Sequence, residues 1–120
     1  MAEKTLEEEL EWFDERFVKS MARINYLRLI ELGYTTGYDI LQHMKGHFKL
    51  KLSAAAVYPV LQCLESDGYT RGEWVKGKHP SKKKYALTPK GRKLLTAWRR
   101  RMHKLVDDII NRRAENGCHR

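Results

Sequence analysis

The chain has 120 residues, a mass of 14.2 kDa and a formal net charge of +9, with a pI of about 9.7. This length predicts one domain, with or without helical extensions, and a small core that a dimer could enlarge. The excess of bases favours a polyanionic partner over a neutral one. Two cysteines exclude a disulfide framework, and neither a signal peptide nor a membrane-spanning apolar run is visible, so we expect a soluble cytoplasmic protein with no membrane partner.

The charge is unevenly placed along the chain. Between residues 1 and 15 acids dominate and Lys4 is the only base. Between residues 71 and 104 the reverse holds, and Glu73 is the only acid. We therefore expect the C-terminal half to face a polyanion and the N-terminal end to face away from it.

The first predicted helix reaches about residue 20. Thr5 followed by Glu8 forms a capping-box pattern, and apolar residues then recur at helical spacing, at Leu6, Leu10, Phe13 and Phe17. This stripe packs either against its own subunit or across a dimer interface. The sequence leaves both interpretations open.

Two further helices predict a helix-turn-helix core. The first spans residues 21–32 and ends at Gly33, and the second begins after Thr36, with Asp39 at its third position. Short connections between these helices and the next one are typical of a helix-turn-helix. On the second helix, His43 and His47 have a metal-compatible spacing, but without a third ligand a solvated or phosphate-facing pair is favoured and no metal is predicted.

A fourth helix is predicted from Ser53, its cap, to about Asp67, with Val57, Leu61 and Leu64 buried. Before it, residues 48–52 alternate apolar and basic, which predicts a short strand with Lys49 and Lys51 facing outward. Proline within the helix, at residue 59, deletes one hydrogen bond and allows a kink, but the apolar spacing continues across it, so we expect one helix. The exposed face is expected to enter the DNA major groove, where small side chains approach thymine methyl groups, through Ser53, Ala54, Ala55, Tyr58 and Gln62. This face holds no Arg or Asn for a bidentate base contact, so much of the specificity is expected from DNA shape.

A β-hairpin with a basic tip follows, from strands at residues 69–75 and 84–87. Bases gather around Gly77 and Pro80, at Lys76, Lys78, His79, Lys82 and Lys83. The cluster is either a solvated loop or, beside a recognition helix, a wing that holds phosphates, and we favour the wing. Trp74 is expected to pack the hairpin onto the core.

The last helix is predicted to start at Thr88 and Pro89 and to reach about Arg113. Its apolar residues alternate spacings of three and four, as in a coiled coil, at Leu95, Trp98, Met102, Leu105 and Ile109. Since a small core offers little to cover this stripe, we expect a homodimer. Two-fold symmetry would place the two recognition helices about one DNA turn, ~34 Å, apart.

Several of these segments resemble the PadR family of winged-helix transcriptional regulators. They are Gly37-Tyr38-Asp39-Ile40, then residues 52–61 with Val57-Tyr58-Pro59, then residues 64–69, and finally Tyr85-Ala86-Leu87-Thr88-Pro89-Lys90-Gly91. The resemblance covers about residues 24–91. It departs from the family at Thr36, where His is frequent, and at Ala55-Ala56, where Gly and Thr are frequent, which leaves the recognition helix fewer hydrogen-bonding groups.

The resemblance implies a mainly α fold with a small β-hairpin, a winged helix-turn-helix with N- and C-terminal dimerisation helices. The expected parts are an acidic helix (1–20), a DNA-binding domain (21–88), a dimerisation helix (89–113) and a frayed tail (114–120). Some members bind planar drugs or phenolics beside aromatic groups of the last helix, which makes Trp98 either an effector contact or a core residue.

We therefore expect a sequence-specific DNA-binding regulator, more often a repressor in this family, acting as a homodimer on a pseudo-palindromic operator and responding to a small planar aromatic effector. The alternative is a basic architectural DNA- or RNA-binding protein, and a third interpretation is an interaction module docking through the acidic helix. No Gly-rich phosphate loop or catalytic Ser/His/Asp or Cys/His spacing is present, so neither an enzyme nor a cofactor is predicted.

Overall fold

The structure is a computed structural model that describes residues 3–48, 52–77 and 81–113. In these ranges the chain forms five helices and one two-stranded antiparallel hairpin. The elements in chain order are α1 (Leu6–Ser20), α2 (Ala22–Glu31), α3 (Gly37–Phe48), α4 (Ala54–Ser66), β1 (Thr70–Val75), β2 (Lys82–Leu87) and α5 (Pro89–Asn111). The predicted fold class, mainly α with a small hairpin, is confirmed.

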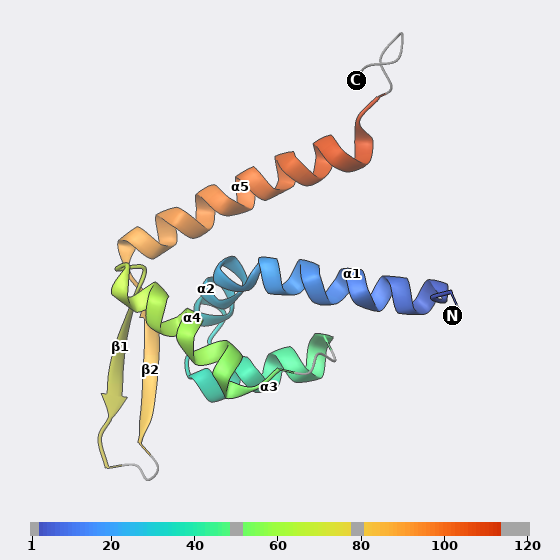
Figure 1. Cartoon of the computed structure of the whole chain (residues 1–120). Helices are drawn as coiled ribbons and strands as arrows, with labels where there is room; N and C mark the ends of the chain where they lie inside the picture. The colour runs from blue at the N-terminus through green and yellow to red at the C-terminus, as the bar shows by residue number, and fades with distance from the viewer. Residues whose placement is uncertain (1–2, 49–51, 78–80, 114–120) are drawn as a thin grey trace.

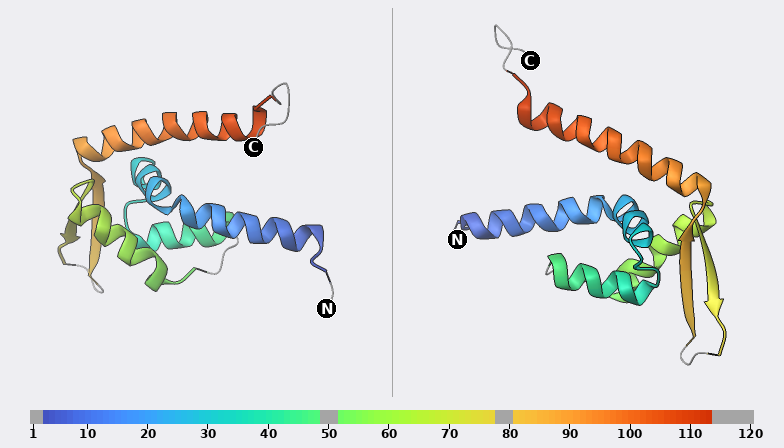
Figure 2. Two further views of the ribbon diagram at one scale, coloured as in Figure 1. Left: turned by 45° about the horizontal axis from the view of Figure 1, so that its top comes forward. Right: turned by 180° about the vertical axis from the view of Figure 1, so that it is seen from behind.

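Two helices project as arms from a small central body (Figure 1). The N-terminal part of α1 and the C-terminal part of α5 extend toward the same side, while the hairpin points away from α5 at the other end (Figures 1 and 2). The radius of gyration, 18.1 Å, exceeds the value of about 14 Å expected for a compact domain of this length. The arms account for the elongated shape, and they leave most of their surface uncovered.

The helix starts follow the predicted caps, with one exception. Thr5 and Glu8 form the complete capping box, with bonds of 2.9 and 3.1 Å. Thr36 Oγ1 accepts from Asp39 N, and Thr88 Oγ1 accepts from Gly91 N, each at 3.0 Å. Ser53 holds the N-cap position of α4, but its side chain makes no capping bond. The predicted cap position is therefore confirmed, but the side-chain bond expected of a serine cap is not formed.

The core lies where α2, α4 and the base of the hairpin meet α3 and the first turns of α5. Its fully buried large side chains are Leu27, Ile40, Met44, Val57, Leu61, Leu64 and Leu95. Burying apolar side chains contributes roughly 1.5–3 kcal/mol each, so this cluster holds the four helices and the hairpin in one unit. Val18 is the buried residue of α1, which explains why the rest of that helix stands free of the core.

Register in the hairpin decides which side chains face α4. Thr70 pairs with Leu87, Gly72 with Tyr85 and Trp74 with Lys83. Because opposite residues in an antiparallel pair share a face, Gly72, Trp74, Lys83 and Tyr85 lie on one side of the hairpin. A bridge between Thr36 and Lys84, with Tyr85 N donating to Thr35 O at 2.8 Å, ties the hairpin to the start of α3.

Several boundaries differ from the sequence prediction. Phe48 is the last residue of α3 rather than the start of a strand, and residues 49–51 lie outside the described residues. β2 begins at Lys82 rather than Lys84, because pairing with Val75 continues the ladder by two residues. α4 runs unbroken through Pro59, whose ring lies on the exposed side, so the carbonyl left without its helical donor, that of Ala55, belongs to an exposed residue.

Candidate nucleic-acid interface

The outer face of α4 is a shallow, weakly polar surface. Ser53, Ala54, Ala55, Tyr58 and Gln62, all predicted to contact DNA, are exposed in the structure. Sequence reasoning missed two further exposed residues, Pro59 and Ser66, which continue the line of Ala55 and Gln62 at helical spacing. The small side chains at the N-terminal end allow a close backbone approach by a ligand.

Tyr58 lies over the start of α3. Its ring is packed so closely against Gly37 that a Cβ there would lie 2.6 Å from Tyr58 Cζ. Tyr58 is still 44% exposed, and Tyr38, next to Gly37, is 61% exposed. The two phenol groups therefore stand beside the exposed face of α4, where a hydroxyl can donate to a phosphate.

One carboxylate of α4 bonds both strands of the hairpin. Glu65 Oε1 lies 2.7 Å from Lys83 Nζ, and Glu65 Oε2 accepts from Gly72 N at 3.0 Å. The bond from Lys83 lowers the pKa of Glu65, and the bond from Gly72 acts in the same direction. The same pair raises the pKa of Lys83. Helix α4 and the hairpin are thus joined by charge-assisted hydrogen bonds.

The basic residues of the hairpin occupy different environments. Lys76 and Lys82 are exposed, whereas the side chain of Lys83 is only 26% exposed. Lys78 and His79, and also Lys49 and Lys51, lie outside the described residues. The predicted basic tip is therefore described only at its two flanks.

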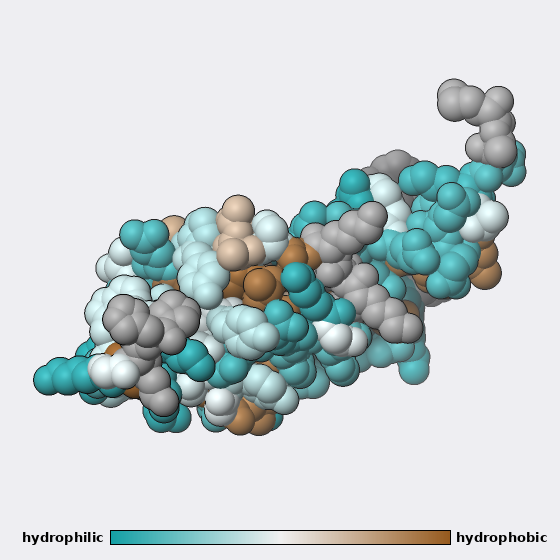
Figure 3. Space-filling view, turned by 90° about the horizontal axis from the view of Figure 1, so that it is seen from below, coloured by the Kyte–Doolittle hydropathy of each residue, from teal (hydrophilic) through white to brown (hydrophobic). Residues whose placement is uncertain are grey.

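Trp74 contradicts its prediction as a core residue. It is 64% exposed, because β1 carries it beyond the buried base of the hairpin. Its ring lies 5.5 Å from Lys83 Nζ. Together with Tyr38, Tyr58, Glu65 and Lys83 it lines a groove between α4 and the hairpin. Figure 3 views the molecule from the side to which the hairpin points, and that face is largely hydrophilic.

The predicted apolar stripes of the two arms are exposed in this single chain. Leu6, Leu10, Phe13 and Phe17 are between 42% and 77% exposed on α1, and Leu105 and Ile109 are 53% and 74% exposed on α5. Leu95 differs from the prediction that placed it in a dimer interface, because it is 1% exposed and belongs to the core of its own subunit. Trp98 is partly buried and packs against that core.

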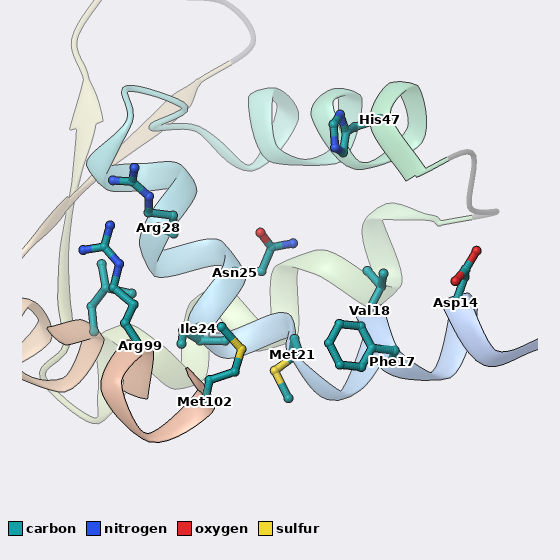
Figure 4. Close-up of a pocket in the computed structure, with 11 residues that line it drawn as sticks. Asp14, Phe17, Val18, Met21, Ile24, Asn25, Arg28, His47, Arg99 and Met102 are labelled. Atoms are coloured by element: carbon teal, nitrogen blue, oxygen red, sulfur yellow. The ribbon is translucent and has the colours of Figure 1, made fainter. Parts of the chain in front are cut away.

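A groove of about 520 Å³ lies at the base of the two arms (Figure 4). Phe17 and Met21 line it from the end of α1, and Met102 and Arg99 line it from α5. The exposed stripes of both arms continue outward from this groove, since Phe13 and Leu105 lie one turn beyond Phe17 and Met102. The apolar surfaces of α1 and α5 therefore border one shared space.

The histidine pair forms ring contacts. His43 lies 4.6 Å from the ring of Tyr34 and 5.3 Å from that of His47. Among the residues that the structure describes, no group of three potential metal ligands gathers. Nor is any helix of this part of the chain both long and apolar enough to cross a membrane.

A family model for the PadR-like transcriptional regulators matches residues 26–97, which include the helix-turn-helix, the hairpin and the start of α5. The chain belongs to the PadR-like family. PadR-like proteins are DNA-binding transcription factors and not enzymes, so the chain is assigned to DNA-binding regulation.

Solved structures agree with this assignment. A PadR-like transcription factor from Bacteroides fragilis is 26% identical, with a TM-score of 0.69 over 79% of this chain and 92% of its own. A PadR-like regulator from Bacillus cereus, at 20% identity, has a TM-score of 0.70 over 80% and 94% of the two chains and shows the shared fold. A transcriptional regulator from Clostridium thermocellum, also 20% identical, has a TM-score of 0.67 over 83% of this chain and 96% of its own. No curated protein matches the sequence.

Proposed function

We propose that this PadR-like protein is a sequence-specific regulator, acting as a repressor, that binds a pseudo-palindromic DNA operator as a homodimer. The observation that carries the proposal is the junction of α4 and the hairpin, where Glu65 joins the two elements that a winged helix presents to DNA. The exposed face of α4 enters the major groove, and the lysines of the hairpin hold phosphates.

Base contacts in this arrangement are few. Ala54 and Ala55 approach the bases closely and touch thymine methyl groups, while Gln62 supplies an amide to adenine or another base edge. Tyr38 and Tyr58 donate to phosphates. The electrostatic attraction comes from basic side chains, namely Lys76 and Lys82 and the predicted contacts Lys49, Lys51, Lys78 and His79. Much of the specificity then comes from DNA shape and from the spacing of the half-sites.

The dimer is supported by the exposed stripes of the arms. A second copy offers an apolar helix that fits between α1 and α5, and burial of Phe13, Leu105 and Ile109 supplies the driving force. Flanking charges are complementary, since α1 is acidic and the first half of α5 is basic. A two-fold axis between the arms places both α4 helices on one face of the duplex.

Competition binding on duplex DNA tests the proposal. The full chain is titrated onto a labelled duplex from the region upstream of its own gene, with unlabelled random duplex or RNA as competitor. A preference for the upstream duplex, with log affinity falling by about 0.9 per phosphate contact on a log-salt axis, is the expected result. Equal binding to all competitors would instead support the architectural DNA- or RNA-binding alternative. Loss of affinity in the double variant Lys82→Ala, Lys83→Ala is expected on either interpretation.

Response to a planar aromatic effector is the last part of the proposal. The groove at the base of the arms has a size typical of small-molecule sites, and apolar side chains dominate its lining. Trp98 lies on α5, which lines this groove through Arg99 and Met102, so its fluorescence is the expected reporter of effector binding. A titration of planar aromatic compounds in a Trp12→Phe, Trp74→Phe background isolates Trp98 fluorescence, and quenching by none of them would assign Trp98 to packing alone. We also propose a cytoplasmic location, because a DNA-binding regulator needs access to its operator.

A further inference from the structure

Lys83 differs from the exposed lysines that flank it in the hairpin. Its side chain is only 26% exposed and faces Glu65 of α4, from the side of the hairpin that also carries Gly72 and Tyr85. Its ammonium group lies 2.7 Å from Glu65 Oε1, and the rings of Trp74 and Tyr85 lie 5.5 and 5.6 Å from it. A lysine held by a carboxylate and two rings has its charge paired within the protein, without a phosphate.

Glu65 contacts both strands of the hairpin at once. One oxygen binds the side chain from β2, and the other accepts the backbone N–H of Gly72 in β1 at 3.0 Å. This bidentate arrangement fixes the rotation of the hairpin relative to α4, because two bonds to separate strands cannot be kept if the hairpin turns.

Gly72 is the position that makes this approach feasible. A Cβ there would overlap Lys83 Cε and lie 3.1 Å from Glu65 Oε2. Any side chain at residue 72 would therefore displace the lysine, the carboxylate or both. Glycine, glutamate and lysine form one unit, which we call the wing clamp: Glu65, Gly72 and Lys83.

We propose that the wing clamp positions the hairpin for operator recognition and that Lys83, unlike its neighbour Lys82, is not a phosphate contact. The inference rests on the proposed function for its DNA partner, and it changes the role of one predicted DNA-binding residue. Glu65 and Lys83 act through the geometry of the hairpin and are positioning residues.

Glu65→Gln separates positioning from simple electrostatics because the two act in opposite directions. Removing a carboxylate beside the DNA and releasing an ammonium group strengthens attraction to any duplex. Loss of the clamp misplaces the hairpin and weakens the contacts that distinguish the operator. We therefore expect Glu65→Gln to bind random duplex more tightly and to lower the ratio of upstream to random affinity by about tenfold, the effect of losing one charge-assisted hydrogen bond.

The first measurement compares two adjacent lysines by the same substitution, Lys82→Met and Lys83→Met, in the full chain. The slope of log affinity against log salt is measured on random duplex, so the result does not depend on an operator. Lys82→Met is expected to reduce the slope by about 0.9, and Lys83→Met is expected to leave it unchanged. An equal reduction by both variants would show that Lys83 binds phosphate and would overturn the inference.

The second measurement uses Gly72→Ala, which disturbs the clamp without changing any charge. It is expected to lower the upstream-to-random ratio as Glu65→Gln does, but without the gain on random duplex. Far-ultraviolet circular dichroism and thermal melting establish whether each variant is folded. If Gly72→Ala does not fold, Lys83→Met supplies another variant in which the clamp is broken. An unchanged ratio in folded clamp variants would overturn the inference. If wild-type protein shows no preference for the upstream duplex, the proposed function fails, while the salt slopes still decide the role of Lys83.

Discussion

The ring of Tyr58 on α4 covers the backbone of Gly37 at the start of α3. A Cβ at residue 37 would overlap Tyr58 Cε1 and lie 2.9 Å from the phenol oxygen. We predict that Gly37→Ala leaves the fold intact, because alanine is favourable in a helix and the exposed ring can swing aside. In the proposed DNA complex the displaced phenol no longer reaches a phosphate, so DNA affinity is expected to fall about fivefold, as for loss of one hydrogen bond. Titration of duplex DNA by fluorescence anisotropy measures this change.

Gly46→Ala is the matched control on the same helix. A Cβ at residue 46 meets no atom within 4 Å, so the same substitution there adds helix propensity and displaces nothing. A double variant, Gly37→Ala with Tyr58→Ala, is expected to bind no more weakly than Tyr58→Ala alone. Additive losses would contradict a common cause.

Gly91→Ala is predicted to destabilise the whole domain. Gly91 is buried in the first turn of α5, where an added Cβ would overlap the backbone oxygen of Tyr69. Backbone atoms cannot swing aside as the Tyr58 ring does, so α5 must move away from the base of the hairpin. Overpacking of this kind costs about 2 kcal/mol or more in unfolding free energy. Urea unfolding measures the loss, and a midpoint equal to that of Gly46→Ala would contradict it.

The stability contribution of the wing clamp should depend on pH. Hydrogen bonds from Lys83 and Gly72 lower the pKa of Glu65 in the folded state. A carboxylate with a lowered pKa contributes stability that is present above its unfolded pKa, about 4.3, and is lost as pH falls through its folded pKa. Lys83 has a raised pKa, so its contribution is full at neutral pH and is lost only as pH rises through that value.

Comparison of wild type with Glu65→Gln isolates this contribution. At about pH 7 wild type should be more stable by about 0.5–1 kcal/mol, the range for a partly exposed ion pair. Near pH 3 the difference should shrink toward zero. Urea unfolding at both pH values measures it, with Glu73→Gln as control because Glu73 is exposed and 4.0 Å from its nearest base. A difference that grows with acid would contradict the assignment.

The order and type of the elements were predictable because local signals agreed with the final packing. The capping box at Thr5 and the Thr88–Pro89 start both depend on residues within one turn, and both appear in the structure. Pro59 was a genuine conflict between local propensity and apolar spacing, and the spacing prevailed because the helix is anchored by Val57 and Leu61.

The environment of the hairpin residues was not predictable from local pattern. Which lysine faces α4 depends on register, and the loop that sets the register carries no signal for it. A shift of the strand register by one residue would exchange the faces on which Lys82 and Lys83 lie. Trp74 was expected to pack the hairpin onto the core, whereas its distance from the core follows from the length of the hairpin. The prediction for Leu95 differed from the structure for another reason, since residues of a core and of a dimer interface recur at the same apolar spacing along a helix.

The apolar stripe of α5 provides the last prediction. Ile109 is 74% exposed and lies far along the arm from the buried residues of its own subunit. A charge at this position costs the isolated chain little but must be desolvated in the proposed dimer. Ile109→Glu is therefore expected to weaken self-association by roughly a hundredfold while leaving helix content unchanged.

Thr96→Glu introduces the same charge on another exposed face of the same helix. Since that face is not part of the stripe, this control should remain associated at the concentration at which Ile109→Glu dissociates. Sedimentation equilibrium measures both, with circular dichroism to confirm the fold. Equal association of the two variants would remove Ile109 from the interface. Dissociation of both would instead trace the effect to added negative charge near a basic helix, because each glutamate changes the net charge by the same amount.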